Sequence, residues 1–269
     1  QVRIQSLNRD ASQQDLQNVT SLIVFTVKKY YYGLLQAQRT RDVAAATVRQ
    51  YQAHLDQANG FFQVGVKARF DVTKAEVDLS NAKIVLLTAE NNVRIAKVNL
   101  NNAMGFPGAP EYGIQDNLAY QPYAMTFDEA VKKAYAQRPD LQALLLRENS
   151  LQKSYDLARK GYYPSVTGSA NYVFDNQVFP LERGWTVGAQ LTVPIFSGNS
   201  TKYQMDEARA NLDALKANEE ALRQSIYLDV QQAFLNLELA RNQIVASELA
   251  VRQADDNLDI ANGRYAAGL

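Results

Sequence analysis

A seven-residue repeat of small side chains dominates one stretch of the sequence. Alanine recurs at Ala68, Ala75, Ala82, Ala89, Ala96 and Ala103. Larger apolar residues alternate with these alanines, at Val72, Leu79, Leu86, Val93 and Leu100. Such a heptad predicts a helix whose apolar seam packs along another helix as a coiled coil, and alanine on the seam lets the two backbones approach closely. We therefore expect a fold built from long, close-packed helices.

The stretch before this heptad predicts the partner helix. Residues 3–63 contain no proline, and glycine occurs there only at Gly33 and Gly60. One uninterrupted helix of about 60 residues, about 90 Å long, is the simplest interpretation.

A glycine marks the turn between these two helices. Gly65 stands at the join, and the second helix is expected over residues 66–104, where Gly105 and Pro107 end it. Residues 1–104 are therefore predicted to form a long antiparallel helical hairpin.

The segment from about Ser200 to Asn262 repeats the first helix. A shift of 203 residues aligns the two without a gap and places Gly65 on Gly268. The matches include Ile23 with Ile226, Leu34 with Leu237, Val48-Arg49-Gln50 with Val251-Arg252-Gln253, and Ala58-Asn59-Gly60 with Ala261-Asn262-Gly263. Matched polar residues lie outside what a shared apolar seam explains, so we interpret residues 199–269 as a truncated repeat of residues 1–66. On this interpretation the sequence is an internal fragment, with a strand pair expected upstream and a returning helix downstream.

Shorter elements separate the two long helical segments. Residues 105–137 begin irregularly, and a capping box from Thr126 to Glu129 predicts a short helix that ends near Gln137. Residues 138–161 predict another helix, with Pro139 in its first turn.

Residues 162–198 alternate in the manner of two β-strands, expected over Ser165–Phe174 and Trp185–Phe196. One face of the pair would carry mainly apolar residues: Val166, Ala170, Tyr172, Phe174, Trp185, Val187, Ala189, Leu191 and Val193. The other face would carry small polar residues: Ser165, Thr167, Ser169, Asn171, Thr186, Gln190 and Thr192.

The strand pair has two possible interpretations. Its strand length of about ten residues and its alternation match a transmembrane β-barrel, whose apolar face meets lipid and whose polar face meets the lumen. Alternatively, a soluble hairpin packs its apolar face on a helix. A lone hairpin is marginally stable and has two open edges. If each full chain supplied two hairpins, as the repeat implies, three chains would close a barrel of about twelve strands.

Four short motifs carry a resemblance to a known family. They are Gly65 followed by Asp71-Val72, then Arg138-Pro139-Asp140-Leu141, Tyr163-Pro164, and Val193-Pro194-Ile195-Phe196-Ser197-Gly198. In this order, between repeated heptad helices, they resemble the TolC-like outer-membrane efflux family over essentially the whole sequence. The resemblance implies a mainly α-helical fold with a β-hairpin.

The family architecture implied by this resemblance is a homotrimer in the bacterial outer membrane. It has a β-barrel in the lipid, a long periplasmic α-barrel and an equatorial segment, which residues 105–137 match. Such a protein conducts cargo passively, in a tripartite efflux or type I secretion system. The alternative is a scaffolding coiled-coil protein with a soluble hairpin.

The resemblance also implies partners. A periplasmic adaptor protein would dock at the helix turns and link the channel to an inner-membrane pump. The positions that match are Phe62, Gly65, Lys67, Arg69, Asp71, Val72 and Gly268. The pore-constricting residues of the family lie on a helix outside this sequence.

Catalytic equipment is not evident from the sequence. The single histidine, His54, aligns with Asn257 in the repeat and is expected to be a solvated helix residue. No phosphate-binding loop, nucleophile motif or metal-ligand spacing occurs, so we expect no enzyme activity, cofactor or metal. The 28 basic residues balance 28 acidic ones, which disfavours nucleic acid as a partner.

Overall fold

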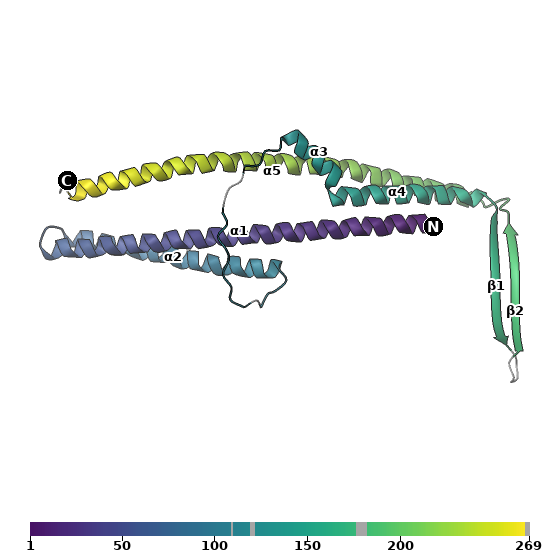
Figure 1. Ribbon diagram of the computed structural model, residues 1–269, viewed down its shortest axis with the longest axis horizontal. Coiled ribbons are helices and arrows are strands. Elements are labelled where there is room, and N and C mark those ends of the chain that lie inside the picture. The colour runs from purple at the N-terminus through teal and green to yellow at the C-terminus, as the bar shows by residue number, and fades with distance from the viewer. Residues whose placement is uncertain (109, 119–121, 176–181, 267–269) are drawn as a thin grey trace. The chain divides into compact units, whose positions relative to one another are not determined.

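The structure is a computed structural model that describes residues 1–108, 110–118, 122–175 and 182–266. The elements in chain order are α1 (Val2–Gln63), α2 (Arg69–Ala103), α3 (Phe127–Gln137), α4 (Pro139–Arg159), a 3₁₀ turn (Lys160–Tyr162), β1 (Ser165–Asp175), β2 (Glu182–Thr192) and α5 (Ser200–Ala266) (Figure 1). Two compact units divide the chain, and α1 runs through both. We call Asn18–Tyr123 the turn unit, and Gln1–Gln17 with Ala124–Leu269 the strand unit.

The turn unit is the predicted antiparallel pair of α1 and α2. The heptad seam is confirmed, because from Val72 to Ala103 every position of the alternating apolar and alanine set is buried or half-buried. On α1 the buried partners include Leu34, Leu35 and Ala44. Ala44 and Ala82 line one shallow groove between the helices, where small side chains allow close approach.

Helix α2 begins three residues later than the sequence predicts. Gly65 has φ of +75°. Its N–H donates to the Phe62 carbonyl at 3.0 Å, and the Val66 N–H donates to the Phe61 carbonyl at 2.9 Å. This pattern is a Schellman motif, which ends a helix at a left-handed residue. Residues 66–68 belong to the turn, so the expected start of α2 at Val66 was wrong.

An irregular segment after α2 is held against both helices of the turn unit. The Tyr112 hydroxyl donates to the Asn101 side-chain oxygen, and the Lys97 ammonium lies 5.0 Å from the centre of the Tyr112 ring. Further along, Arg39 of α1 forms an ion pair with Asp116. These contacts hold the segment around Tyr112 and Asp116 in place, although it has no regular secondary structure.

In the strand unit, α3 packs on α5 through aromatic rings. The Phe127 ring centre lies 5.5 Å from that of Tyr227 and 5.9 Å from that of Phe234, both edge-to-face. The Tyr135 hydroxyl donates to the Arg223 carbonyl at 3.2 Å. The predicted capping box is confirmed, because the Thr126 N–H donates to Glu129 at 2.9 Å and the Thr126 hydroxyl accepts from the Glu129 N–H.

The start of α4 is tied to α5 by an arginine. Arg138 donates to Asp140 at 2.7 Å and to Asp229 of α5 at 3.0 Å. Burial tends to raise the pKa of the Asp140 carboxyl, but hydrogen bonds from Arg138 and from the Leu141 N–H outweigh burial and hold that pKa below its usual value. The motif that carries part of the family resemblance therefore ties the junction between α3 and α4 to α5.

Strands β1 and β2 form a two-stranded antiparallel sheet. Its register pairs Ser165 with Thr192 at one end and Tyr172 with Trp185 toward the other. The second strand was expected to reach Phe196 but ends at Thr192. Pro194 cannot donate a ladder hydrogen bond, and this explains the earlier end.

Within the described part of the chain, no helix combines the length and the apolar character needed to cross a bilayer.

Candidate functional site

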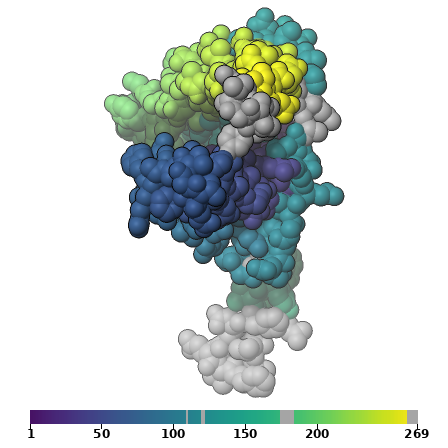
Figure 2. Space-filling model, turned by 90° about the vertical axis from the view of Figure 1, so that its left-hand side faces the viewer, coloured from purple at the N-terminus to yellow at the C-terminus, as the bar shows by residue number. Residues whose placement is uncertain are grey.

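The turn between α1 and α2 is the first candidate site. It forms an exposed surface at the end of the hairpin, which faces the viewer in blue in Figure 2. Phe62, Lys67 and Arg69 are all solvent-exposed, and the Lys67 ammonium lies 5.9 Å from the centre of the Phe61 ring. The turn therefore offers apolar and cationic groups together, which suits a protein partner rather than a small substrate.

Two of the residues predicted to form the docking turn stabilise the helical hairpin itself. Val72 is 8% exposed and lies in the seam of the helix pair. Asp71 accepts a hydrogen bond from the Ala68 N–H at 3.3 Å, as a carboxylate at a helix N-terminus does. Phe70, which the sequence reasoning missed, is 75% exposed beside them. The sequence signal that could have identified Phe70 was an aromatic residue at a position outside the heptad seam. Gly268 lies outside the described residues.

Replacing Gly65 with alanine tests how far the turn depends on its backbone. A Cβ at Gly65 would meet no atom within 4 Å, so the cost is that of holding alanine in the left-handed region at φ of +75°. We expect the free energy of unfolding of the 269-residue chain to fall by about 1–2 kcal/mol, measured by thermal denaturation. The control is Gly60→Ala inside α1, which should stabilise by about 0.5–1 kcal/mol. Equal effects of the two changes would contradict the Schellman assignment.

The strand pair is the second candidate site. Cross-strand partners share a face of a sheet, and the register places predicted apolar residues opposite one another. These pairs are Val166 with Leu191, Ala170 with Val187, and Tyr172 with Trp185. The backbone of Phe174 pairs with that of Arg183, and their side chains lie outside what the structure describes. The polar positions pair likewise: Ser165 with Thr192, Thr167 with Gln190, and Asn171 with Thr186. Val193 lies beyond the end of β2. The two faces therefore differ in chemistry along the hairpin.

Helix α2 carries a second apolar face that the sequence reasoning did not single out. Its members are exposed and lie opposite the seam: Val77, Ile84, Leu87, Ile95 and Val98. Val77, Ile84 and Val98 occupy one heptad position, so the signal was present in the same repeat as the seam. A helix with apolar residues on opposite sides is suited to a wall in which it has a neighbour on each side.

A search of protein families matches residues 1–106 and 130–269 to the family described as outer membrane efflux protein. The chain belongs to the outer membrane efflux protein family. Membership places the protein in the bacterial outer membrane with an extension into the periplasm, and confirms the TolC-like resemblance.

Two relatives are similar to this chain over nearly its whole length. The outer membrane protein TolC of Vibrio cholerae serotype O1 is 23% identical over 282 residues, which are 99% of this chain and 64% of that protein. The probable efflux pump outer membrane protein TtgC of Pseudomonas putida is 22% identical over 285 residues, again 99% of this chain, and 57% of the relative. The chain thus spans 57% to 64% of the length of these relatives.

Solved structures support the fold. The outer membrane protein VceC from Vibrio cholerae aligns with a TM-score of 0.78 at 18% identity, covering 100% of this chain and 65% of that one. The open-state MtrE outer membrane channel of Neisseria gonorrhoeae aligns with a TM-score of 0.78 at 19% identity, covering 99% of this chain and 61% of that one.

The single histidine of the chain lies on the surface of α1. His54 is exposed, with its ring centre 6.4 Å from that of Tyr51. Among the residues that the structure describes, no group of three or more histidine, cysteine, aspartate or glutamate side chains could hold a metal ion. The relatives and solved structures named above are outer membrane proteins; TtgC is described as a probable efflux pump component and MtrE as a channel.

Proposed function

We propose that the full-length protein is one subunit of a homotrimeric outer-membrane channel that conducts cargo passively for a tripartite efflux or type I secretion system. The observation that carries this proposal is the pair of opposite apolar faces on α2. One face packs against α1 in the seam, and the other, which includes Val77, Ile84 and Val98, is exposed. A neighbouring subunit would bury that second face.

The strand pair supports the same arrangement. Each of its strands has one partner among the described residues, so each strand keeps an open edge. Open edges are not tolerated in hydrocarbon, and closure with strands of other subunits removes them. Val187 and Leu191 would then face lipid, while Thr186 and Gln190 would face a water-filled lumen.

The division of the chain follows from this arrangement. Residues 1–104 and 199–269 would build the periplasmic α-barrel, residues 105–137 its equatorial segment, residues 138–161 the helix leading to the membrane, and residues 162–198 a hairpin of the β-barrel. Passive conduction through such a wall would require no catalytic residues. An inner-membrane pump would supply the energy.

The turn of the α1–α2 hairpin is proposed as the docking point for a periplasmic adaptor protein. Phe62 and Phe70 are exposed apolar groups there, and Lys67 and Arg69 are exposed cations. Exposed aromatic and arginine side chains are the kinds that dominate protein interfaces. Asp71 and Val72 would support this surface from the helix end, and Gly65 would set the turn.

Planar-bilayer recording of the purified full-length protein tests the conduit. We expect stepwise conductance and recovery of the protein from the outer-membrane fraction. The control is the same purification from cells that lack the gene, which detects contaminating porins. Recovery as a soluble protein without conductance would overturn the proposal and favour a scaffolding role.

A further inference from the structure

A stripe of alternating charge runs along α2 beside its second apolar face. The members of this charged stripe of α2 recur every seven residues and change sign at each step: Arg69, Glu76, Lys83, Glu90 and Lys97. They directly precede apolar positions of that face, as Glu76 precedes Val77 and Lys83 precedes Ile84. None of the five forms an ion pair within the part of the chain that the structure describes. These charges are therefore available to a neighbour of α2.

Helix α5 carries a comparable surface. Its exposed apolar residues include Leu235, Leu239, Leu249 and Ile260. A charged stripe of α5 lies beside them, at spacings of three, four or seven residues that keep its members on one side of the helix: Glu238, Arg241, Glu248, Arg252, Asp255 and Asp259. Among the described residues these six also form no ion pair. Both helices thus combine an exposed apolar face with one charged flank.

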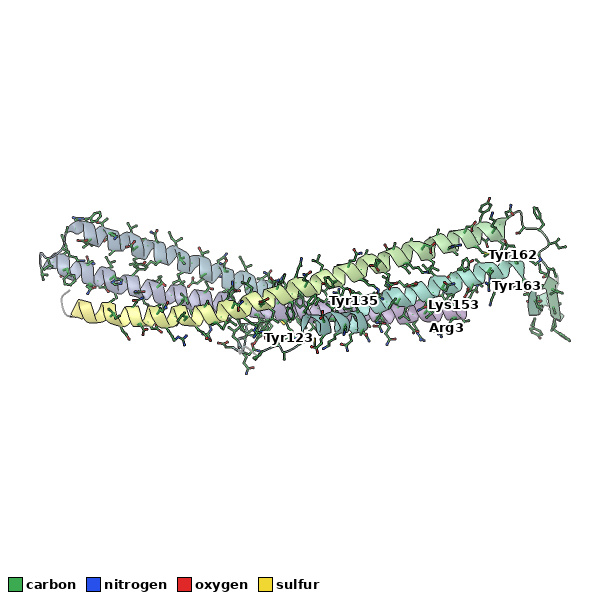
Figure 3. The ribbon with its side chains drawn as sticks, turned by 90° about the horizontal axis from the view of Figure 1, so that it is seen from above. Arg3, Tyr123, Tyr135, Lys153, Tyr162 and Tyr163 are labelled. Carbon is green, nitrogen blue, oxygen red and sulfur yellow. The ribbon has the colours of Figure 1, made fainter. Side chains whose placement is uncertain are left out.

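Within the strand unit, α4 separates α5 from the first part of α1. Helix α4 packs along α5, and Arg147 of α4 forms an ion pair with Asp15 of α1. Figure 3 shows this order, with Lys153 of α4 between α5 and the start of α1 that carries Arg3. One side of α5 is therefore covered by its own chain, which leaves the opposite side for a neighbouring subunit.

The covered side of α5 is its heptad seam. Leu212 and Ile226 are buried there, and the same seven-residue series continues through Ala233, Ala240 and Ser247. The corresponding seam of α1, which includes Leu34 and Ala44, is the face that packs on α2. A helix that follows α5 in the full-length protein would by this repeat cover the same seam. The apolar face and the charged stripe of α5 lie outside it.

The charged flanks of α2 and α5 lie on the side that carries residues 105–137. On α2, the Lys97 ammonium lies 5.0 Å from the centre of the Tyr112 ring. On α5, the Phe127 ring packs on Phe234, which stands seven residues before Arg241 in the charged stripe. When two antiparallel helices pack, flanks on the same side of their contact faces meet each other. The two charged stripes would therefore adjoin.

The repeat predicts the height at which the stripes would meet. Ala44 and Ala82 line one groove between α1 and α2, and the 203-residue shift aligns Ala44 with Ser247. If the hairpins of the assembled wall are level, Ser247 of a neighbouring subunit stands level with Ala82. Counting from this pair in opposite directions brings opposite charges to within two residues of one another, about 3 Å along the axis: Lys83 with Glu248, Glu90 with Arg241, Glu76 with Arg252, and Arg69 with Asp259.

We propose that α5 of one subunit packs antiparallel on α2 of the next, and that these four ion pairs fix the register of the contact. The proposal rests on the proposed function, because it requires the trimer. The apolar faces alone do not fix the register, since heptad positions recur every seven residues. A slip of one heptad would set Glu76 against Glu248 in one direction and Glu90 against Glu248 in the other. Like charges at an interface disfavour both slips.

Charge reversal in the full-length protein tests the pairing. We expect Lys83→Glu and Glu248→Lys each to lower the trimer-to-monomer ratio in detergent, by about twofold per interface and about tenfold per trimer. The double variant Lys83→Glu/Glu248→Lys restores opposite charges and should return to within about twofold of wild type. Native mass spectrometry gives the ratio. Single variants that assemble as wild type, or a double variant that loses as much as both singles together, would overturn the proposal.

Cross-linking tests the register without reversing a charge. In a cysteine-free full-length protein, Lys83→Cys/Glu248→Cys treated with a short bismaleimide should give covalently linked subunits. The control, Lys83→Cys/Glu238→Cys, moves the second thiol ten residues, about 15 Å along α5, and should give little product. Equal yields from the two pairs would contradict the register. A cross-link formed only within one chain would contradict the assignment to a neighbouring subunit.

The same preparations separate the possible failures. Conductance and the mass of the assembled protein are recorded for each variant. A conducting trimer that fails the reversal and cross-linking tests refutes only the pairing of α5 with α2. A full-length wild-type protein that neither forms a trimer nor conducts refutes the proposed function as well.

Discussion

The Val187→Arg variant of the full-length protein should fail to assemble in the outer membrane. Val187 lies in the middle of β2, opposite Ala170 on the apolar face, and is exposed in the isolated chain. If that face meets hydrocarbon, an arginine near the bilayer midplane costs about 2–4 kcal/mol per subunit. A trimer would carry this cost three times. The measurement is the folded trimer fraction in outer-membrane preparations, read from unfolding in urea.

The matched control is Thr186→Arg. Thr186 is the adjacent residue on β2, at nearly the same depth, and pairs with Asn171 on the polar face. An arginine there would face water in the lumen, so assembly should be nearly unchanged while ion selectivity shifts. If Val187→Arg and Thr186→Arg assembled equally well, the assignment of the two faces would be contradicted.

The Ile226→Ala variant should loosen the packing of α5 with its neighbours. Ile226 is 0% exposed, and α3 and α4 are the helices that pack along α5 in the strand unit. Removing a fully buried isoleucine side chain leaves a cavity and costs about 2–5 kcal/mol. We expect the urea midpoint of the 269-residue chain to fall, with faster hydrogen exchange in α4.

The repeat supplies the control for this variant. Ile23 aligns with Ile226 under the 203-residue shift but is 51% exposed. Ile23→Ala should cost less than about 1 kcal/mol, because the deleted atoms are already largely in water. If both variants lose the same stability, the packing of the strand unit is not as described.

The helical architecture follows from sequence because each helix signal is local and repeated many times. The heptad from Val72 to Leu100 specifies which side of α2 is covered, and the capping box at Thr126 specifies where α3 begins. The turn at Gly65 was placed correctly, but its length was not. After the Schellman motif at Gly65, the turn continues over residues 66–68, and these residues carry no sequence signal for or against a helix.

Features that depend on packing between distant segments were not predictable from patterns. Arg138 at the start of α4 and Asp229 of α5 are 91 residues apart, and no sequence pattern pairs them. The exposed state of Ile23 beside the buried state of its repeat partner also has no sequence signal. Both depend on which element covers a helix rather than on the helix itself.

Cysteine scanning of β2 tests the channel wall most directly. The 269 residues contain no cysteine, so each single replacement at residues 185–192 introduces the one thiol within them, and any cysteine elsewhere in the full-length protein is first replaced by serine. In the full-length protein in membranes, a membrane-impermeant maleimide should label Thr186→Cys, Gln190→Cys and Thr192→Cys. It should leave Val187→Cys, Ala189→Cys and Leu191→Cys unlabelled, because lipid covers them. Uniform labelling along the strand, or labelling of the apolar positions alone, would contradict a membrane hairpin with one face toward lipid and one toward a water-filled lumen.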